Sequence, residues 1–133
     1  MSKRASASES PKGDGQNSTT TLPSYTLEQL NLFTENFDDS KRKGSGSSAI
    51  VYQGIDDGKP IALKRYRAGA EHLPAQYSVE KAFYSSYQHP NIIKAFGVCE
   101  ENDKEPCFIL EYAPKVLDNE HKSNLLTNLF LFK

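Results

Sequence analysis

The chain has 133 residues and a nearly even charge balance, with 16 Lys and Arg against 17 Asp and Glu and a formal net charge of −1. This length allows one small domain with flanking segments, and therefore one modest core. A balanced charge generates no long-range field, so the composition indicates neither nucleic acid nor an anionic membrane surface as a partner.

Cysteine usage and hydropathy indicate the compartment. The chain has 2 Cys, Cys99 and Cys107, which are too few for a disulfide framework. No apolar run follows the basic start at residues 1–4, as a secretory signal requires, and no stretch approaches the roughly 20 apolar residues of a membrane span. We therefore expect a cytoplasmic protein without a membrane span, in a reducing environment.

Two segments precede the predicted domain. Residues 1–23 are rich in Ser, Thr, Gly and Lys, and such a segment cannot offset the entropy lost on ordering, so a disordered tail is predicted. Residues 24–37 carry Leu27, Leu30 and Phe33 at three-to-four spacing behind the possible cap Thr26. This pattern predicts a short amphipathic helix that leads into the domain and covers one of its surfaces.

A hairpin is predicted next. β-Branched and aromatic side chains fill residues 49–52, and residues 59–64 resume an extended pattern. Between them, Asp56, Asp57 and Gly58 form a strong turn signal. Two strands joined by a tight turn are therefore expected.

The main helix is predicted after this hairpin. Residues 76–88 contain no Gly or Pro, and they bring Tyr77, Glu80 and Tyr84 one turn apart. Pro74 is well suited to open such a helix because its missing N–H is not needed in the first turn. This spacing places Glu80 on the side that should meet the sheet, although a solvated surface glutamate is the alternative.

A second hairpin completes the expected fold. Residues 96–99 and 107–110 flank a polar connection, which brings Cys99 and Cys107 across from each other, as buried free thiols or as a redox pair. The expected fold class is α+β: a five-stranded antiparallel sheet with one main helix packed on one face.

The chemistry of the chain centres on a glycine-rich stretch at residues 44–48. Positions without side chains let backbone amides approach phosphate oxygens, although Gly-Ser composition alone is equally typical of a linker. Lys64 follows on the neighbouring strand, where its ammonium would reach the same phosphates, and Glu80 could pair with it. The three features together predict a phosphate-covering loop above a braced lysine.

The order of these features resembles the small lobe of eukaryotic protein kinases. The Gly-rich loop, Lys64, Glu80, the string HPNIIKAFG and the string FILEYAP occur in the order that is typical of the family. The stretch from residue 25 to 66 resembles, more narrowly, the plant receptor-like and receptor-like cytoplasmic kinases. The resemblance implies a kinase-like N-lobe at 38–114 that binds ATP, followed by a divergent tail at 115–133.

The resemblance also implies roles for the phosphate side of this lobe. Gly44 and Gly46 would arch over the phosphates of ATP. Lys64 would bind the α- and β-phosphates, with Glu80 as its brace. Mg²⁺ would be held only through the nucleotide, because no metal ligand of this chain is indicated.

The adenine side is implied in the same way. Val51 and Ala62 would enclose the ring, Leu110 matches the gatekeeper position, and the backbones of Glu111 and Ala113 would bond the adenine edge. Tyr84 matches the helix member of the hydrophobic spine that links the two lobes, and an ordinary core aromatic is the alternative.

The chain departs from the family pattern in two ways. Ala49 stands where the family usually has a third loop glycine, and no His-Arg-Asp, Asp-Phe-Gly or Ala-Pro-Glu string follows Pro114. Those strings supply the base and the Mg²⁺ ligands of phosphoryl transfer. We therefore expect a lobe truncated before the catalytic segment, with weak or vestigial ATP binding and no phosphate transfer on its own. The alternative is a non-catalytic module that docks protein partners through the exposed face of the lobe.

Overall fold

The computed structural model describes residues 21–70, 73–87 and 90–113. Residues 1–20 of the predicted tail at 1–23 and the whole predicted tail at 115–133 lie outside that range. Along the chain it contains α1 (Leu27–Thr34), the 3₁₀ turn η1 (Asp39–Lys41), β1 (Arg42–Ser45), β2 (Ala49–Asp56), β3 (Lys59–Tyr66), α2 (Leu73–Ser86), β4 (Ala95–Cys99) and β5 (Cys107–Glu111).

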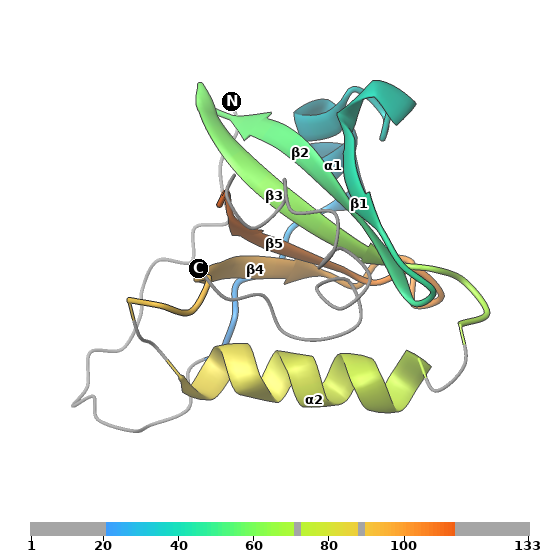
Figure 1. Ribbon diagram of the computed structural model, residues 1–133, viewed down its shortest axis with the longest axis vertical. Coiled ribbons are helices and arrows are strands. Elements are labelled where there is room, and N and C mark those ends of the chain that lie inside the picture. Colours follow the sequence, from blue (N-terminus) through green and yellow to red (C-terminus); the bar gives the residue numbers. More distant parts are fainter. Residues whose placement is uncertain (1–20, 71–72, 88–89, 114–133) are drawn as a thin grey trace.

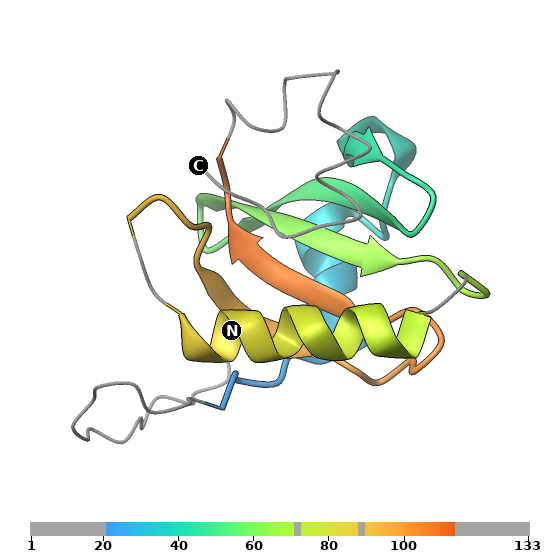
Figure 2. The same ribbon diagram turned by 60° about the horizontal axis from the view of Figure 1, so that its bottom comes forward.

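The five strands form one antiparallel sheet with the order β1-β2-β3-β5-β4. Figure 1 shows α2 along one side of the twisted sheet and α1 beyond the other side. The view in Figure 2 brings α2 forward, so that the sheet lies between the two helices. The predicted fold class, an antiparallel five-stranded sheet with one main helix, is confirmed.

Strand alternation gives this sheet two apolar faces, because successive side chains of a strand point to opposite sides. The face towards α2 buries Ala49, Val51, Ala62, Tyr66, Phe108 and Leu110 with Leu73 and Tyr84 of the helix. The face towards α1 buries Tyr52, Ile61, Leu63 and Ile109 with Leu30 and Phe33. In the register of β2 and β3, Val51 pairs with Lys64. Lys64 therefore enters the layer between the sheet and α2.

A two-residue turn fixes this register. Asp56 pairs with Lys59, and between them Asp57 and Gly58 have φ angles of 57° and 81°. Positive φ at both central positions is the geometry of a type I′ turn, whose twist matches that of the two strands. The Asp-Gly signal in the sequence therefore sets which residues of β3 face α2.

The chain before β1 covers the other side of the sheet. Thr26 caps α1 through a capping box with Gln29, as the sequence predicts. Just before the helix, Tyr25 donates its N–H to the Val98 carbonyl at 2.7 Å. The Val98 N–H donates to the Pro23 carbonyl at 2.9 Å, so residues 23–25 run alongside β4. This segment fastens α1 to the edge of the sheet.

Helix α2 begins at Leu73, earlier than the predicted residue 76, and ends at Ser86. Pro74 lies in its first turn, where a missing N–H removes no hydrogen bond of the helix. The inward residues Leu73, Glu80 and Tyr84 are buried, in accordance with the predicted helical period.

The two cysteines face each other across the second hairpin. Cys99 of β4 pairs with Cys107 of β5, and both are buried free thiols. Burial raises the pKa of Cys99 and of Cys107, which keeps both protonated at neutral pH.

Candidate functional site

The centre of the site is a buried ion pair between Lys64 of β3 and Glu80 of α2. The Lys64 ammonium lies 3.0 Å from Oε1 and 3.1 Å from Oε2 of the Glu80 carboxylate. Lys64 is 0% exposed and Glu80 is 2% exposed. Because one partner belongs to the sheet and the other to the helix, the pair holds α2 turned towards the sheet.

Two tyrosines surround the Glu80 carboxylate. The Tyr66 hydroxyl donates to Oε1 of Glu80, and the Tyr84 hydroxyl donates to Oε2 at 3.0 Å. Both tyrosines are almost fully buried. Sequence reasoning treated Tyr84 only as an apolar residue and gave Tyr66 no role. The available signal for Tyr66 was its place two residues after Lys64, on the same face of the strand.

The electrostatics of this cluster follow from its burial. Desolvation lowers the pKa of Lys64, and the charge and hydrogen bonds of Glu80 oppose that shift. Burial and the nearby Glu80 charge raise the pKa of Tyr66 well above its ordinary range. The Lys64 ammonium also lies 5.4 Å from the centre of the Tyr66 ring. Tyr66 is therefore a neutral hydrogen-bond donor at physiological pH.

The glycine-rich loop lies between β1 and β2, and β2 pairs with the strand that carries Lys64. Gly44 belongs to β1 and Gly46 to the loop, where the Gly46 N–H donates to the Ala49 carbonyl at 2.9 Å. Ala49, which replaces the expected third glycine, is 0% exposed and packs in the cluster beneath α2. A methyl side chain at this position is thus part of the core.

Arg67 is a residue of this region that sequence reasoning missed. Its Nε donates to the Gly46 carbonyl at 2.9 Å, and its Nη2 donates to the Ser45 hydroxyl at 3.0 Å. Its backbone N–H donates to the Ser48 carbonyl at 2.8 Å. These bonds tie the loop to the end of β3, and no sequence pattern pointed to them.

The three apolar residues matched to an adenine site lie in the layer between the sheet and α2. Val51 and Ala62 are 0% and 1% exposed, and Leu110 pairs with Ala62 across β3 and β5. Glu111 ends β5 and donates its N–H to the Lys94 carbonyl at 2.8 Å, and Ala113 is the last described residue. The structure thus places all three apolar residues on the α2 side, next to Lys64.

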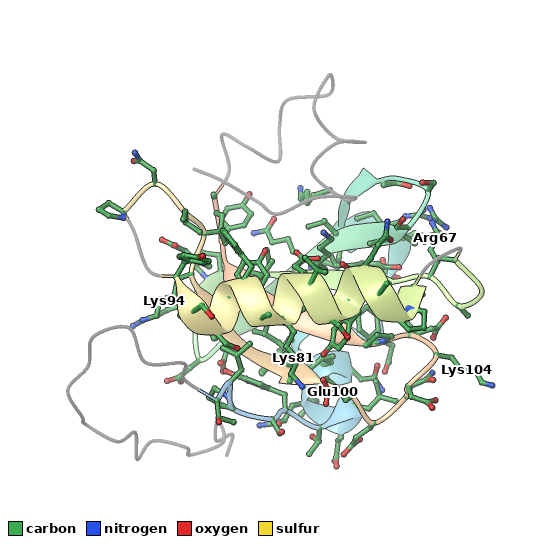
Figure 3. The ribbon with its side chains drawn as sticks, turned by 90° about the horizontal axis from the view of Figure 1, so that it is seen from below. Arg67, Lys81, Lys94, Glu100 and Lys104 are labelled. Carbon is green, nitrogen blue, oxygen red and sulfur yellow. The ribbon has the colours of Figure 1, made fainter. Side chains whose placement is uncertain are left out.

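Helix α2 has a second attachment, at its outer edge. The Lys81 ammonium lies 2.7 Å from Oε2 of Glu100, and the Tyr77 hydroxyl donates to the same oxygen at 2.6 Å. Figure 3 shows Lys81 and Glu100 close together beside the helix. Partial burial pushes the pKa of Glu100 upward, but the bonds from Lys81 and Tyr77 outweigh it and keep that pKa below its ordinary value.

Among residues 21–70, 73–87 and 90–113, no group of three or more His, Cys, Asp or Glu is placed to hold a metal ion. Neither described helix has the length and apolar character needed to cross a membrane.

A five-stranded antiparallel sheet, a helix whose glutamate pairs with a strand lysine, and a Gly-rich turn before them define the small lobe of a protein kinase. No family model matches the chain. Relatives nevertheless share extended sequence similarity with it.

The similar proteins are plant receptor-like kinases. A probable LRR receptor-like serine/threonine-protein kinase of Arabidopsis thaliana is 36% identical over 90 residues, which are 67% of this chain and 9% of the relative. A G-type lectin S-receptor-like serine/threonine-protein kinase of the same plant is 31% identical over 109 residues, 80% of this chain and 13% of the relative. The chain belongs to the protein kinase family and, within it, to the plant receptor-like group. It spans about a tenth of the length of the curated relatives that it matches.

Proposed function

We propose that residues 38–114 form the ATP-covering lobe of a protein kinase, and that the 133 residues do not transfer phosphate on their own. The observation that carries this proposal is the buried pair of Lys64 and Glu80. An ammonium held by a carboxylate below a glycine-rich loop is the arrangement with which kinases position the α- and β-phosphates of ATP.

The donor chemistry of the lobe fits a nucleotide. Lys64 would contact the phosphates, which carry negative charge. Gly44 and Gly46 would arch over the phosphates without side chains in the way. Val51 and Ala62 have almost no exposed surface in the described conformation, so their side chains would contact the adenine ring only after the layer around them opens. Leu110 would limit the depth of the pocket, and the backbones of Glu111 and Ala113 would bond the adenine edge.

The missing catalytic strings and the presence of a single lobe favour weak binding and no catalysis. ATP supplies the phosphoryl group, but the Mg²⁺ ligands and the base of kinases come from strings that do not occur in these 133 residues. One lobe also covers only one side of a nucleotide, whereas tight sites bury about 70–90% of a ligand. Mg²⁺ would therefore be held only through the nucleotide. The protein-interaction alternative has no comparable support in the described residues.

A cytoplasmic location remains part of the proposal, because 2 Cys are too few for a disulfide framework and suit a reducing compartment.

Titration with a fluorescent ATP analogue tests the binding proposal. The wild-type chain should bind the analogue weakly but saturably, and Lys64→Met should lose at least about tenfold in affinity because the phosphate contact disappears. Lys59→Met is the matched control, since Lys59 lies on the same strand and is exposed at the far turn. Circular dichroism of each variant verifies the fold. Equal affinity of wild type and Lys64→Met would remove Lys64 from the site.

A phosphotransfer assay tests the second half of the proposal. The chain is incubated with radiolabelled ATP, Mg²⁺ and a generic protein substrate, and incorporation is compared with an active kinase. We expect no incorporation into the substrate or into the chain itself. Phosphate transfer by the purified chain, with a signal that Lys64→Met abolishes, would show that the proposal is wrong.

A further inference from the structure

The Glu80 carboxylate has more donors than an ion pair requires. Lys64 donates to both oxygens, the Tyr66 hydroxyl donates to Oε1, and the Tyr84 hydroxyl donates to Oε2. An ionised carboxylate has about four lone-pair sites, and four hydrogen bonds fill them. Each oxygen therefore has one bond from the lysine and one from a tyrosine.

This symmetry matters when Lys64 changes partners. The Lys64 ammonium has three N–H groups, and two of them donate to Glu80. A phosphate group that draws the ammonium towards itself can take over one of these two. A buried carboxylate oxygen that loses its only donor suffers the full desolvation penalty. Here the oxygen that Lys64 releases keeps a tyrosine hydroxyl, so the lysine can turn to the phosphate without leaving a bare buried oxygen.

We propose that Tyr66 and Tyr84 are positioning residues, which hold the Glu80 carboxylate in place so that Lys64 can share its ammonium with a nucleotide phosphate. The inference rests on the proposed nucleotide-binding function and deepens it. The tyrosines come from the two elements that the ion pair joins, Tyr66 from β3 and Tyr84 from α2. They hold the carboxylate from the strand side and from its own helix, before any ligand is present.

Packing alone does not explain the two hydroxyls. The Tyr84 ring lies 5.1 Å from that of Phe108, and the Tyr66 ring lies 6.3 Å from it, so phenylalanine would make the same ring contacts at both positions. A hydroxyl without an acceptor in this layer would be costly. Both hydroxyls donate to the Glu80 carboxylate. Removing either one should therefore loosen the hold on Glu80 without changing the ring packing.

The ligand arm of the test measures the affinity for the fluorescent ATP analogue in Tyr66→Phe, Tyr84→Phe and the double variant. We expect each single change to weaken binding by about fivefold and the double change by at least about tenfold. Tyr77→Phe is the matched control. It removes a hydroxyl that also donates from α2 to a carboxylate, but to Glu100 instead of Glu80, and its affinity should stay within about twofold of the wild type.

The ligand-free arm uses proton NMR of the hydroxyl groups. A tyrosine proton held by a buried carboxylate exchanges slowly with water and gives a separate downfield resonance. Without nucleotide we expect two such signals, one lost in Tyr66→Phe and the other in Tyr84→Phe.

The two arms separate the possible failures. If the wild type shows no saturable binding, the proposed nucleotide function is wrong, and the role of the tyrosines towards a phosphate falls with it even if both signals appear. If the wild type binds but the signals are absent, the hydroxyls do not hold Glu80. If both signals appear and the double variant binds as well as Tyr77→Phe, the tyrosines are core residues only, and the inference is overturned.

Discussion

Lys81 on α2 and Glu100 after β4 form an ion pair of 2.7 Å at the outer edge of the helix. The buried pair of Lys64 and Glu80 joins the same helix to the middle of the sheet. The Lys81–Glu100 pair is partly exposed and the Lys64–Glu80 pair is buried. Breaking the buried pair should therefore lower the free energy of unfolding much more than breaking the exposed one.

The Glu100 pair should make stability depend on pH. The folded-state pKa of Glu100 lies below its ordinary value of 4.5, so its contribution is present above that value and is lost as the pH falls through the folded pKa. Glu100→Gln should cost about 0.5–1 kcal/mol at pH 7, because partly exposed pairs contribute little. Urea unfolding should show this difference at pH 7, and the difference should shrink steadily as the pH is lowered below 4.5. Asp103→Asn, in the turn that follows, is the control, and an equal pH effect in both variants would contradict the assignment.

Removing one partner of the buried pair should lower the free energy of unfolding more than replacing both partners with apolar residues. Lys64→Met leaves a buried carboxylate without its counter-ion, and we expect a loss of about 3–5 kcal/mol in the free energy of unfolding. Lys64→Met combined with Glu80→Met should recover much of this loss, though not all, because two tyrosine hydroxyls then lack their acceptor. Lys81→Met, on the exposed pair, should cost less than about 1 kcal/mol. If the loss in the double variant equals the sum of the losses in Lys64→Met and Glu80→Met measured separately, Lys64 and Glu80 are not coupled.

Gly97 should be essential for the attachment of α1. A Cβ at this position would lie 2.5 Å from the Pro23 carbonyl oxygen and 2.5 Å from a carbon of the Tyr25 ring, so residues 23–25 must move. We expect Gly97→Ala to cost about 1–3 kcal/mol and to make residues 21–34 more sensitive to a low dose of protease.

Gly58→Ala is the control for this change. Gly58 has open space around it but a φ of +81°, so alanine should cost about 1 kcal/mol through strain alone. Its cleavage pattern should be that of the wild type. Protection of residues 21–34 in Gly97→Ala would show that the segment tolerates a methyl group there.

The two thiols should be inert in the native protein. Cys99 and Cys107 are buried, and burial raises the pKa of both. At pH 7.5 a disulfide reagent such as DTNB should label neither within minutes, and unfolding in urea should release both. Rapid labelling of one thiol in the absence of urea would show that the second hairpin opens easily.

Much of the fold was predictable because its signals are local. The Asp57-Gly58 turn, the capping residue Thr26 and the period of α2 each act within a few residues, and each appears where it was predicted. The contact between Lys64 and Glu80 also follows from local patterns, namely the alternation of β3 and the helical period of α2, once the helix packs on the sheet.

The remaining features depend on contacts that no local pattern encodes. Arg67 reaches the glycine-rich loop only because the twist of β2 and β3 brings the two together. The Tyr66 hydroxyl meets Glu80 only once α2 has packed on the sheet. Strand and helix patterns treat tyrosine as an apolar residue, so they do not report where its hydroxyl is directed.

The alignment of residues 23–25 with β4 has a practical consequence for anyone who produces this lobe. β4 is the outermost strand on its side of the sheet, and an uncovered outer strand recruits other chains. A recombinant version that starts after residue 26 would lose that cover and the attachment of α1, which covers the apolar surface of the sheet. Starting the polypeptide at or before residue 21 should therefore decide whether the lobe is recovered as monomer or as precipitate.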